Sequence, residues 1–216
     1  MKNFNSLPLV VYLILVSCNV TNQNNKGVDF VDTATVFKKE IPMYGNGEYD
    51  FFYTLYKARH KQLGLDSIEN GFENLQIRVW YDFSFVKKRQ LVVITNTNSG
   101  WFATVYDMKV NWNGKTEEII SKKVKHVTPK FGWQYFSKTL LDFKIVTLPN
   151  QDDIADYRRG HDGSSFNIEV ATKKQYRFYG YWEPVFNARE FWQAKNIVGV
   201  LQLFKDELGV SYNPHK

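Results

Sequence analysis

Hydrophobic and polar residues alternate through the middle of the chain, and this alternation predicts an antiparallel meander. Between Leu75 and Phe83 every second residue is apolar, which is the period of a strand with one buried face. The same period returns in residues 90–95 and 101–108. The third stretch continues through residues 109–112, and the pair Asn113-Gly114 then separates it from a fourth extended stretch at residues 115–120. This dipeptide accepts the positive φ angles of a tight hairpin turn. We therefore expect four strands joined in sequence order.

A second region of alternation lies further along the chain. Residues 166–171 and 176–182 each show a period of two and predict another hairpin, which brings the expected sheet to about six strands. Between the two regions, residues 131–146 place apolar side chains at helical spacing.

Two more segments have the spacing of helices. Residues 49–63 fit a helix whose apolar stripe includes the stem of Arg59, although a strand through the first few residues is an alternative. The last helix is the clearest, because Asn187 and Glu190 form a variant of the capping box at its start and Gly209 supplies a stop. The expected fold class is α+β, an antiparallel sheet with helices packed on one face and a long C-terminal helix.

The first residues have the pattern of an export signal. Lys2 precedes an apolar run at residues 7–16, and the run ends in the sequence LVSC at residues 15–18. At ~1.5 Å per residue, residues 7–17 cover roughly 16 Å, which is too short to cross the ~30 Å of bilayer hydrocarbon.

The LVSC sequence resembles the lipobox of bacterial lipoproteins, with a leucine three positions before the cysteine. That resemblance implies that Cys18 is acylated and that residues 1–17 are removed as a signal peptide. Residues 18–28 would then form a polar, Asn-rich tether, and residues 29–216 a single domain. Asn19 is not the aspartate that retains such lipoproteins in an inner membrane, so the resemblance favours the outer membrane, facing the periplasm. The latter half of the chain also resembles uncharacterised lipoprotein domains of Bacteroidetes-like bacteria.

Composition narrows the choice of partners. Apolar residues make up 44% of the chain, which excludes a disordered protein, and aromatic residues reach 17%, enough to supply both a core and a binding surface. The net charge of +6 comes from scattered Lys and Arg residues, and together with export this argues against nucleic acid. Cys18 is the one cysteine in the sequence, so no disulfide within the chain supports the domain.

The parity of side chains along the strands predicts a binding face. If the alternating apolar residues of the strands and Phe178 face one core under the helices, their polar and aromatic neighbours share the opposite, open face of the sheet. The predicted binding residues are Arg78, Trp80, Asp82, Glu169, Arg177, Tyr179 and Tyr181. Flat aromatic rings beside planar polar groups suit a glycan or a protein. The alternative is that these residues form ordinary cross-strand pairs on a solvated sheet.

The sequence gives weaker evidence for a catalytic site than for a binding face. His161 and Asp162 in the segment 149–165 offer a possible base and carboxylate, but adjacent residues rarely pair in this way and an Asp-Gly turn is the preferred explanation. Asp152, Asp153 and Asp156 lack the spacing of a calcium loop and favour a helix start instead. We expect no metal site and no cofactor.

The sequence therefore predicts a membrane-anchored lipoprotein that acts as a non-catalytic binding module for an envelope protein or a glycan. Partners in envelope assembly and toxin inhibitors both fit this class. The alternatives are an envelope hydrolase with its site in residues 149–165 and a structural envelope protein without a specific ligand.

Overall fold

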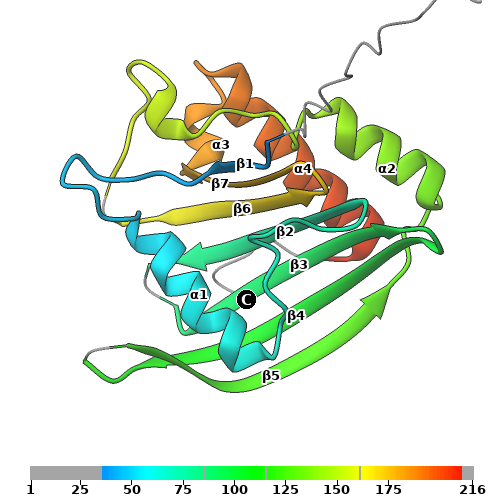
Figure 1. Ribbon diagram of the computed structural model, residues 1–216, viewed down its shortest axis with the longest axis horizontal. Helices are drawn as coiled ribbons and strands as arrows, with labels where there is room; N and C mark the ends of the chain where they lie inside the picture. Colours follow the sequence, from blue (N-terminus) through cyan, green and yellow to red (C-terminus); the bar gives the residue numbers. More distant parts are fainter. Residues whose placement is uncertain (1–35, 85, 115, 161, 211–216) are drawn as a thin grey trace, which may run out of the picture. The chain divides into compact units, whose positions relative to one another are not determined.

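In the part of the chain that the structure describes, seven strands form one sheet, which confirms the predicted α+β class with one strand more than expected. The computed structural model describes residues 36–210 apart from 85, 115 and 161, so Cys18, the predicted signal peptide and His161 lie outside the described residues. The spatial order of the strands is β1-β7-β6-β2-β3-β4-β5 (Figure 1). The strands are β1 (Lys38–Glu40), β2 (Leu75–Phe83), β3 (Lys88–Thr97), β4 (Gly100–Trp112), β5 (Glu117–Val127), β6 (Ser164–Thr172) and β7 (Gln175–Trp182). The pairing is antiparallel except between β1 and β7, and β1 is too short for its alternation to be seen in the sequence.

Local turn chemistry explains the meander β2-β3-β4-β5. The β4–β5 connection forms at the predicted Asn113-Gly114 pair, where Gly114 has a φ of +90°. The side-chain oxygen of Asn113 accepts a hydrogen bond from the backbone N–H of Thr116 at 2.9 Å, which closes the turn. Because this bond joins residues close in the chain, the register of the hairpin is set by local interactions.

The helices are α1 (Phe51–Leu63), α2 (Trp133–Asp142), α3 (Pro184–Asn187) and α4 (Trp192–Leu208), with a short 3₁₀ turn, η1 (Gln151–Asp153). Residues 49–63 therefore contain a helix and not a strand. Asp50 caps it by accepting hydrogen bonds from the N–H groups of Phe52 and Tyr53, and Gly64 ends it in a left-handed conformation.

The predicted start of the last helix is wrong. α4 begins at Trp192, and Asn187 instead ends the separate one-turn helix α3. The Asn187 amide donates hydrogen bonds to the carbonyl oxygens of Arg158, Trp182 and Glu183. Asn187 is thus used to tie a loop to the end of β7, a contact between distant segments that a local capping pattern does not reveal. The stop at Gly209 is confirmed.

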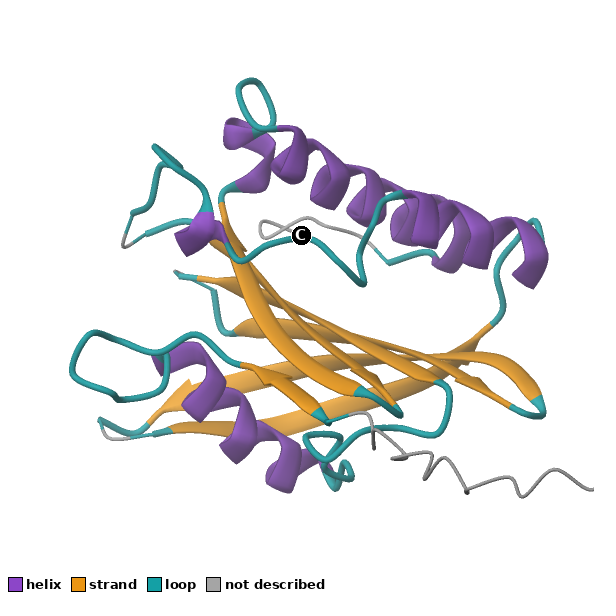
Figure 2. Ribbon diagram, turned by 45° about the horizontal axis from the view of Figure 1, so that its top comes forward, coloured by secondary structure: helices purple, strands orange, loops and turns teal. Residues whose placement is uncertain are grey.

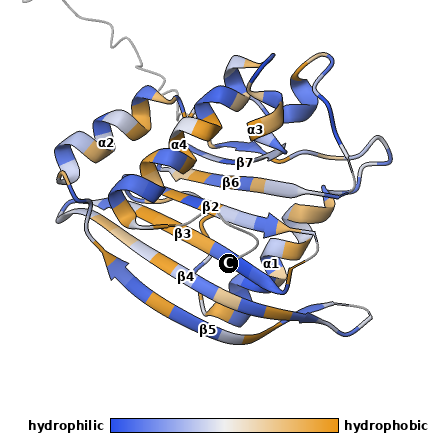
Figure 3. Cartoon of the chain, turned by 180° about the vertical axis from the view of Figure 1, so that it is seen from behind, coloured by the Kyte–Doolittle hydropathy of each residue, from blue (hydrophilic) through white to orange (hydrophobic). Residues whose placement is uncertain are grey.

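Helices cover both faces of the sheet, which corrects the expectation of a single covered face. On one face α2 and α4 pack on Ile77, Val79 and their neighbours in β6 and β7. On the other face α1 packs on Trp80 and Phe178. Figure 2 shows purple helices on both sides of the orange sheet, and Figure 3 shows hydrophilic and hydrophobic segments alternating along the strands. The sheet is therefore a central layer with a core on each side.

Substitution of Gly199 in α4 tests how closely this helix packs against the end of α2. A Cβ added at Gly199 would lie 2.3 Å from Cε1 of Phe143, the partly buried residue at the end of α2. Alanine normally stabilises a helix by up to ~1 kcal/mol relative to glycine. At this position we expect the opposite, a loss of about 1–2 kcal/mol in the free energy of unfolding from overpacking, measured by urea denaturation. In the Gly199→Ala/Phe143→Leu double variant the loss should be smaller than the sum of the two single effects.

Candidate functional site

The seven predicted binding residues do not share a face. Strand pairing places Glu169 opposite Phe178, and Ile168 opposite Tyr179. The side of the sheet that faces α1 therefore carries Arg78, Trp80, Asp82 and Glu169, which share one face with each other as predicted. Arg177, Tyr179 and Tyr181 point to the α4 side. The predicted assignment of the β7 side chains to the two faces was wrong. Both faces of the sheet are buried, so the apolar character of Phe178 did not show which of them it occupies.

Neither group lies on an open surface. Trp80 and Glu169 have 0% and 1% of their surface exposed beneath α1, and Tyr179 and Tyr181 have 1% and 0% exposed on the other face. The hydroxyl of Tyr181 donates to the carbonyl of Pro149 at 2.7 Å, and that of Tyr179 donates to the carbonyl of Ile145. Figure 2 shows a helix over each face. These side chains hold covering segments on the sheet and do not form the predicted binding face.

Arg177 also holds a covering segment on the sheet. Its guanidinium donates to the carbonyl oxygens of Val146 and Leu148 at 2.6 and 2.8 Å, and it pairs with Glu40 of β1. It thereby joins the segment after α2 to the edge of the sheet.

Glu169 is the centre of a buried polar cluster under α1. Its carboxylate accepts hydrogen bonds from Trp80 Nε1 and the Tyr176 hydroxyl, each at 2.9 Å, and lies 2.8 Å from Nε2 of His60. Burial alone would raise the pKa of Glu169, but the hydrogen bond with His60 and the charges of His60 and Arg78 lower it below its ordinary value of 4.5. His60 comes from α1, and no pattern in the sequence indicated a role for this side chain.

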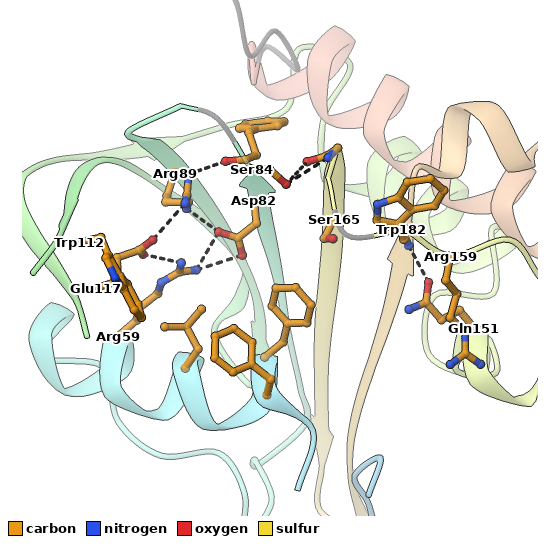
Figure 4. A pocket seen from close by; sticks show the side chains of 16 residues that line it. Arg59, Asp82, Ser84, Arg89, Trp112, Glu117, Gln151, Arg159, Ser165 and Trp182 are labelled. Carbon is orange, nitrogen blue, oxygen red and sulfur yellow. Dashed lines mark hydrogen bonds and ion pairs between the residues drawn. The ribbon is translucent and has the colours of Figure 1, made fainter. Parts of the chain in front are cut away.

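An open cleft lies where α1, the end of β2, the β4–β5 turn and the loop after η1 meet, and its volume is about 300 Å³. This is at the lower end of the ~300–1,000 Å³ range of small-molecule sites. Figure 4 shows its lining side chains. Its lining includes Phe51, Arg59, Asp82, Arg89, Trp112, Glu117 and Trp182.

The floor of the cleft is a ring of alternating charges, formed by Arg59, Asp82, Arg89 and Glu117. Arg59 Nη1 and Arg89 Nε lie 3.0 and 2.7 Å from Asp82 Oδ1. Arg89 Nη2 lies 3.0 Å from Glu117, which Arg59 also contacts. Burial would lower the pKa of Arg59, but the charge of Asp82 raises it above its ordinary value, so the guanidinium stays protonated. We call these four residues the charge ring. It has no net charge.

Two tryptophans stand at opposite sides of the cleft in Figure 4. Trp112 ends β4 beside the hairpin turn and is 57% exposed. Trp182 ends β7, and its Nε1 donates to the carbonyl of Asp162 at 2.9 Å. A Cβ at Gly160 would lie 2.4 Å from the Trp182 ring, so the loop around residue 160 is seated directly on this indole. The wall is thus built from the segment where the sequence placed its candidate hydrolase site.

Of the seven predicted binding residues, only Asp82 lines the cleft; Arg59, Arg89, Trp112, Glu117 and Trp182 were not predicted. These residues come from five different elements or loops, and no spacing in the chain links them. One signal was available in the sequence. Arg59 stands in the apolar stripe of residues 49–63, and a charged head in a buried stripe requires partners on the facing sheet.

The described part of the chain contains no group of three or more His, Cys, Asp or Glu residues arranged to hold a metal ion. Asp152 instead pairs with Arg159, a residue of the cleft lining, at 2.8 Å. Among the same residues, no helix is long and apolar enough to cross a bilayer. The chain matches no protein-family model and none of the curated proteins.

Proposed function

We propose that this protein is an exported lipoprotein, anchored through Cys18 to the periplasmic side of the outer membrane, that serves as a non-catalytic glycan-binding module. The lipobox at residues 15–18 supports the anchor. Two or more acyl chains on one cysteine hold a protein stably on a bilayer, whereas one chain binds only marginally.

For the anchor, we expect radioactive palmitate to label the protein in its host and the Cys18→Ser variant to lose the label. Recovery of the unlabelled native protein with residues 1–17 intact would contradict the proposed anchor.

The observation that carries the binding function is the combination of aromatic walls with the charge ring. The apolar C–H face of a sugar ring packs well on an indole, and Trp112 and Trp182 offer two. Sugar hydroxyls both donate and accept hydrogen bonds, and Arg89, the most exposed member of the charge ring, places a guanidinium donor beside the carboxylates of Asp82 and Glu117. Because the ring is electrically balanced, it suits a neutral polyhydroxyl ligand better than a strongly charged one.

The ring also supports binding over catalysis. Each carboxylate contacts both guanidinium groups, and Asp82 accepts a further hydrogen bond from the Tyr56 hydroxyl. These oxygens are held in fixed positions by their partners. A group preorganised in this way recognises a ligand at little entropic cost.

We expect Trp112→Ala to weaken the binding of neutral oligosaccharides by about thirtyfold, since truncating a central tryptophan costs about 2 kcal/mol. Isothermal titration with a panel of soluble neutral oligosaccharides measures this. Trp192→Ala is the matched control, because Trp192 is similarly exposed at 53% but lies at the start of α4 and not in the cleft. Equal losses in both variants, or binding unaffected by either, would remove the cleft from the proposal.

A hydrolase is the second candidate, because the segment 149–165 supplies Gln151, Arg159, Gly160 and Gly163 to the lining of the cleft. The same oligosaccharide panel separates the two functions. A binding module returns each oligosaccharide intact after long incubation, whereas a hydrolase releases shorter products.

A further inference from the structure

The outer edge of the sheet at β5 forms a second surface, independent of the cleft. β5 spans 11 residues and is the last strand in the order of the sheet, and Figure 1 shows no described strand beyond it. Residues 120–126 are exposed. A strand in this position presents backbone N–H and C=O groups to which another chain can add.

The first part of this edge already carries a strand-like partner. The side-chain amide of Gln62 in α1 donates to the carbonyl of Glu117 at 3.0 Å and accepts from the N–H of Ile119 at 2.7 Å. This is the pair of hydrogen bonds that a residue of an added strand would make. The edge is therefore shaped to accept backbone-type partners, and Gln62 covers only its beginning.

The rest of the edge is basic with apolar side chains between the charges. Lys122, Lys123 and Lys125 are exposed along β5. Val124, between Lys123 and Lys125, is 44% exposed, and Ile120, just before the lysines, is 61% exposed. An extended partner with acidic and apolar residues in alternation would complement this pattern.

We propose that residues 121–127 of β5 bind an acidic extended segment of another envelope protein, which adds to the sheet as an eighth strand. A second copy of this chain is a poor occupant, because edge-to-edge pairing would oppose the lysines of one β5 to those of the other. Lysines on an edge strand also commonly serve to prevent such additions, and the experiment distinguishes that role from recognition.

The test uses the domain, its backbone amide NMR spectrum and a synthetic strand peptide that alternates Val and Glu. We expect the peptide to shift the amide signals of residues 121–127 and to slow their hydrogen exchange. The Lys123→Glu/Lys125→Glu variant should bind at least about tenfold more weakly. Lys195→Glu, which reverses an exposed charge on α4, is the control and should bind like the wild type.

A second peptide, N-methylated at alternate amides, keeps the charge of the first but cannot form strand hydrogen bonds. We expect it to leave the β5 signals unchanged. Equal binding of both peptides, shifts confined to other residues, or self-association of the protein through β5 would each overturn the proposal. Thermal unfolding of the double variant verifies that weaker binding is not a loss of folding.

Discussion

Replacing Arg59 with methionine is expected to lower the free energy of unfolding by about 3–5 kcal/mol. The Arg59 side chain is 1% exposed and contacts both Asp82 and Glu117, whose side chains are 9% and 8% exposed. Methionine fills much of the same volume but removes the charge, so two buried carboxylates would share Arg89 alone in the ring. Removing one partner of a buried ion pair is costly because the remaining charge keeps its desolvation penalty. Urea denaturation followed by tryptophan fluorescence measures the loss.

The control for this variant is Arg158→Met. Arg158 pairs with Glu190 at 2.9 Å, but the two side chains are 54% and 56% exposed. Such a surface pair contributes about 0–1 kcal/mol, so the control should remain close to the wild type. If Arg59→Met were as mild as Arg158→Met, the charge ring would not hold α1 on the sheet, and the proposed preorganisation of the cleft floor would fail with it.

The second large effect concerns Glu169, and we expect Glu169→Gln to cost about 3 kcal/mol. Glutamine preserves the shape of the side chain but removes the charge that faces His60 and Arg78. It also replaces one acceptor oxygen by an amide donor, while Trp80 and Tyr176 both donate at this site. One of these donors would then lack an acceptor in a fully buried position.

The same residue gives the stability a defined dependence on pH. The pKa of Glu169 is lowered in the folded protein, so the folded state holds its proton more weakly than the unfolded state. The stabilisation is fully present above the ordinary carboxyl pKa of 4.5 and is lost as the pH falls from there through the lower folded value. The slope of the free energy of unfolding in this acidic range should be smaller in Glu169→Gln than in the wild type. Equal slopes would show that other groups cause the acid sensitivity.

For Glu169→Gln the matched control is Glu190→Gln, because Glu190 is a half-exposed carboxylate in a surface pair. It should change neither the free energy of unfolding nor its acidic slope by more than about 0.5 kcal/mol.

The elements that depend on neighbouring residues were predictable from the sequence. The two-residue period located β2 and the C-terminal hairpin, the Asn113-Gly114 pair located the β4–β5 turn, and Gly209 located the end of α4. In each case the determining interactions join residues close in the chain, so the local pattern carries the information.

Which side of the sheet each residue occupies was decided by the tertiary structure. The two-residue period of a strand predicts that Glu169 and Ile168 face opposite sides of the sheet. An apolar residue identifies the core face, however, only when the other face is solvated. Here both faces are covered, by α1 and by α4, so the parity of β7 remained undetermined and an expected open surface proved to be two buried layers.

The cleft is likewise a product of the tertiary structure. The charge ring requires α1 to lie across β2, β3 and β5, and the second wall requires a loop to close on Trp182. The sequence by itself determined the strands, their turns and the α+β class, because these follow from the alternation of side chains and from backbone conformations of single residues. Only the tertiary structure brought Arg59, Asp82, Arg89 and Glu117 together, because each of these charges lies on a different element and their contacts leave no periodic trace in the chain.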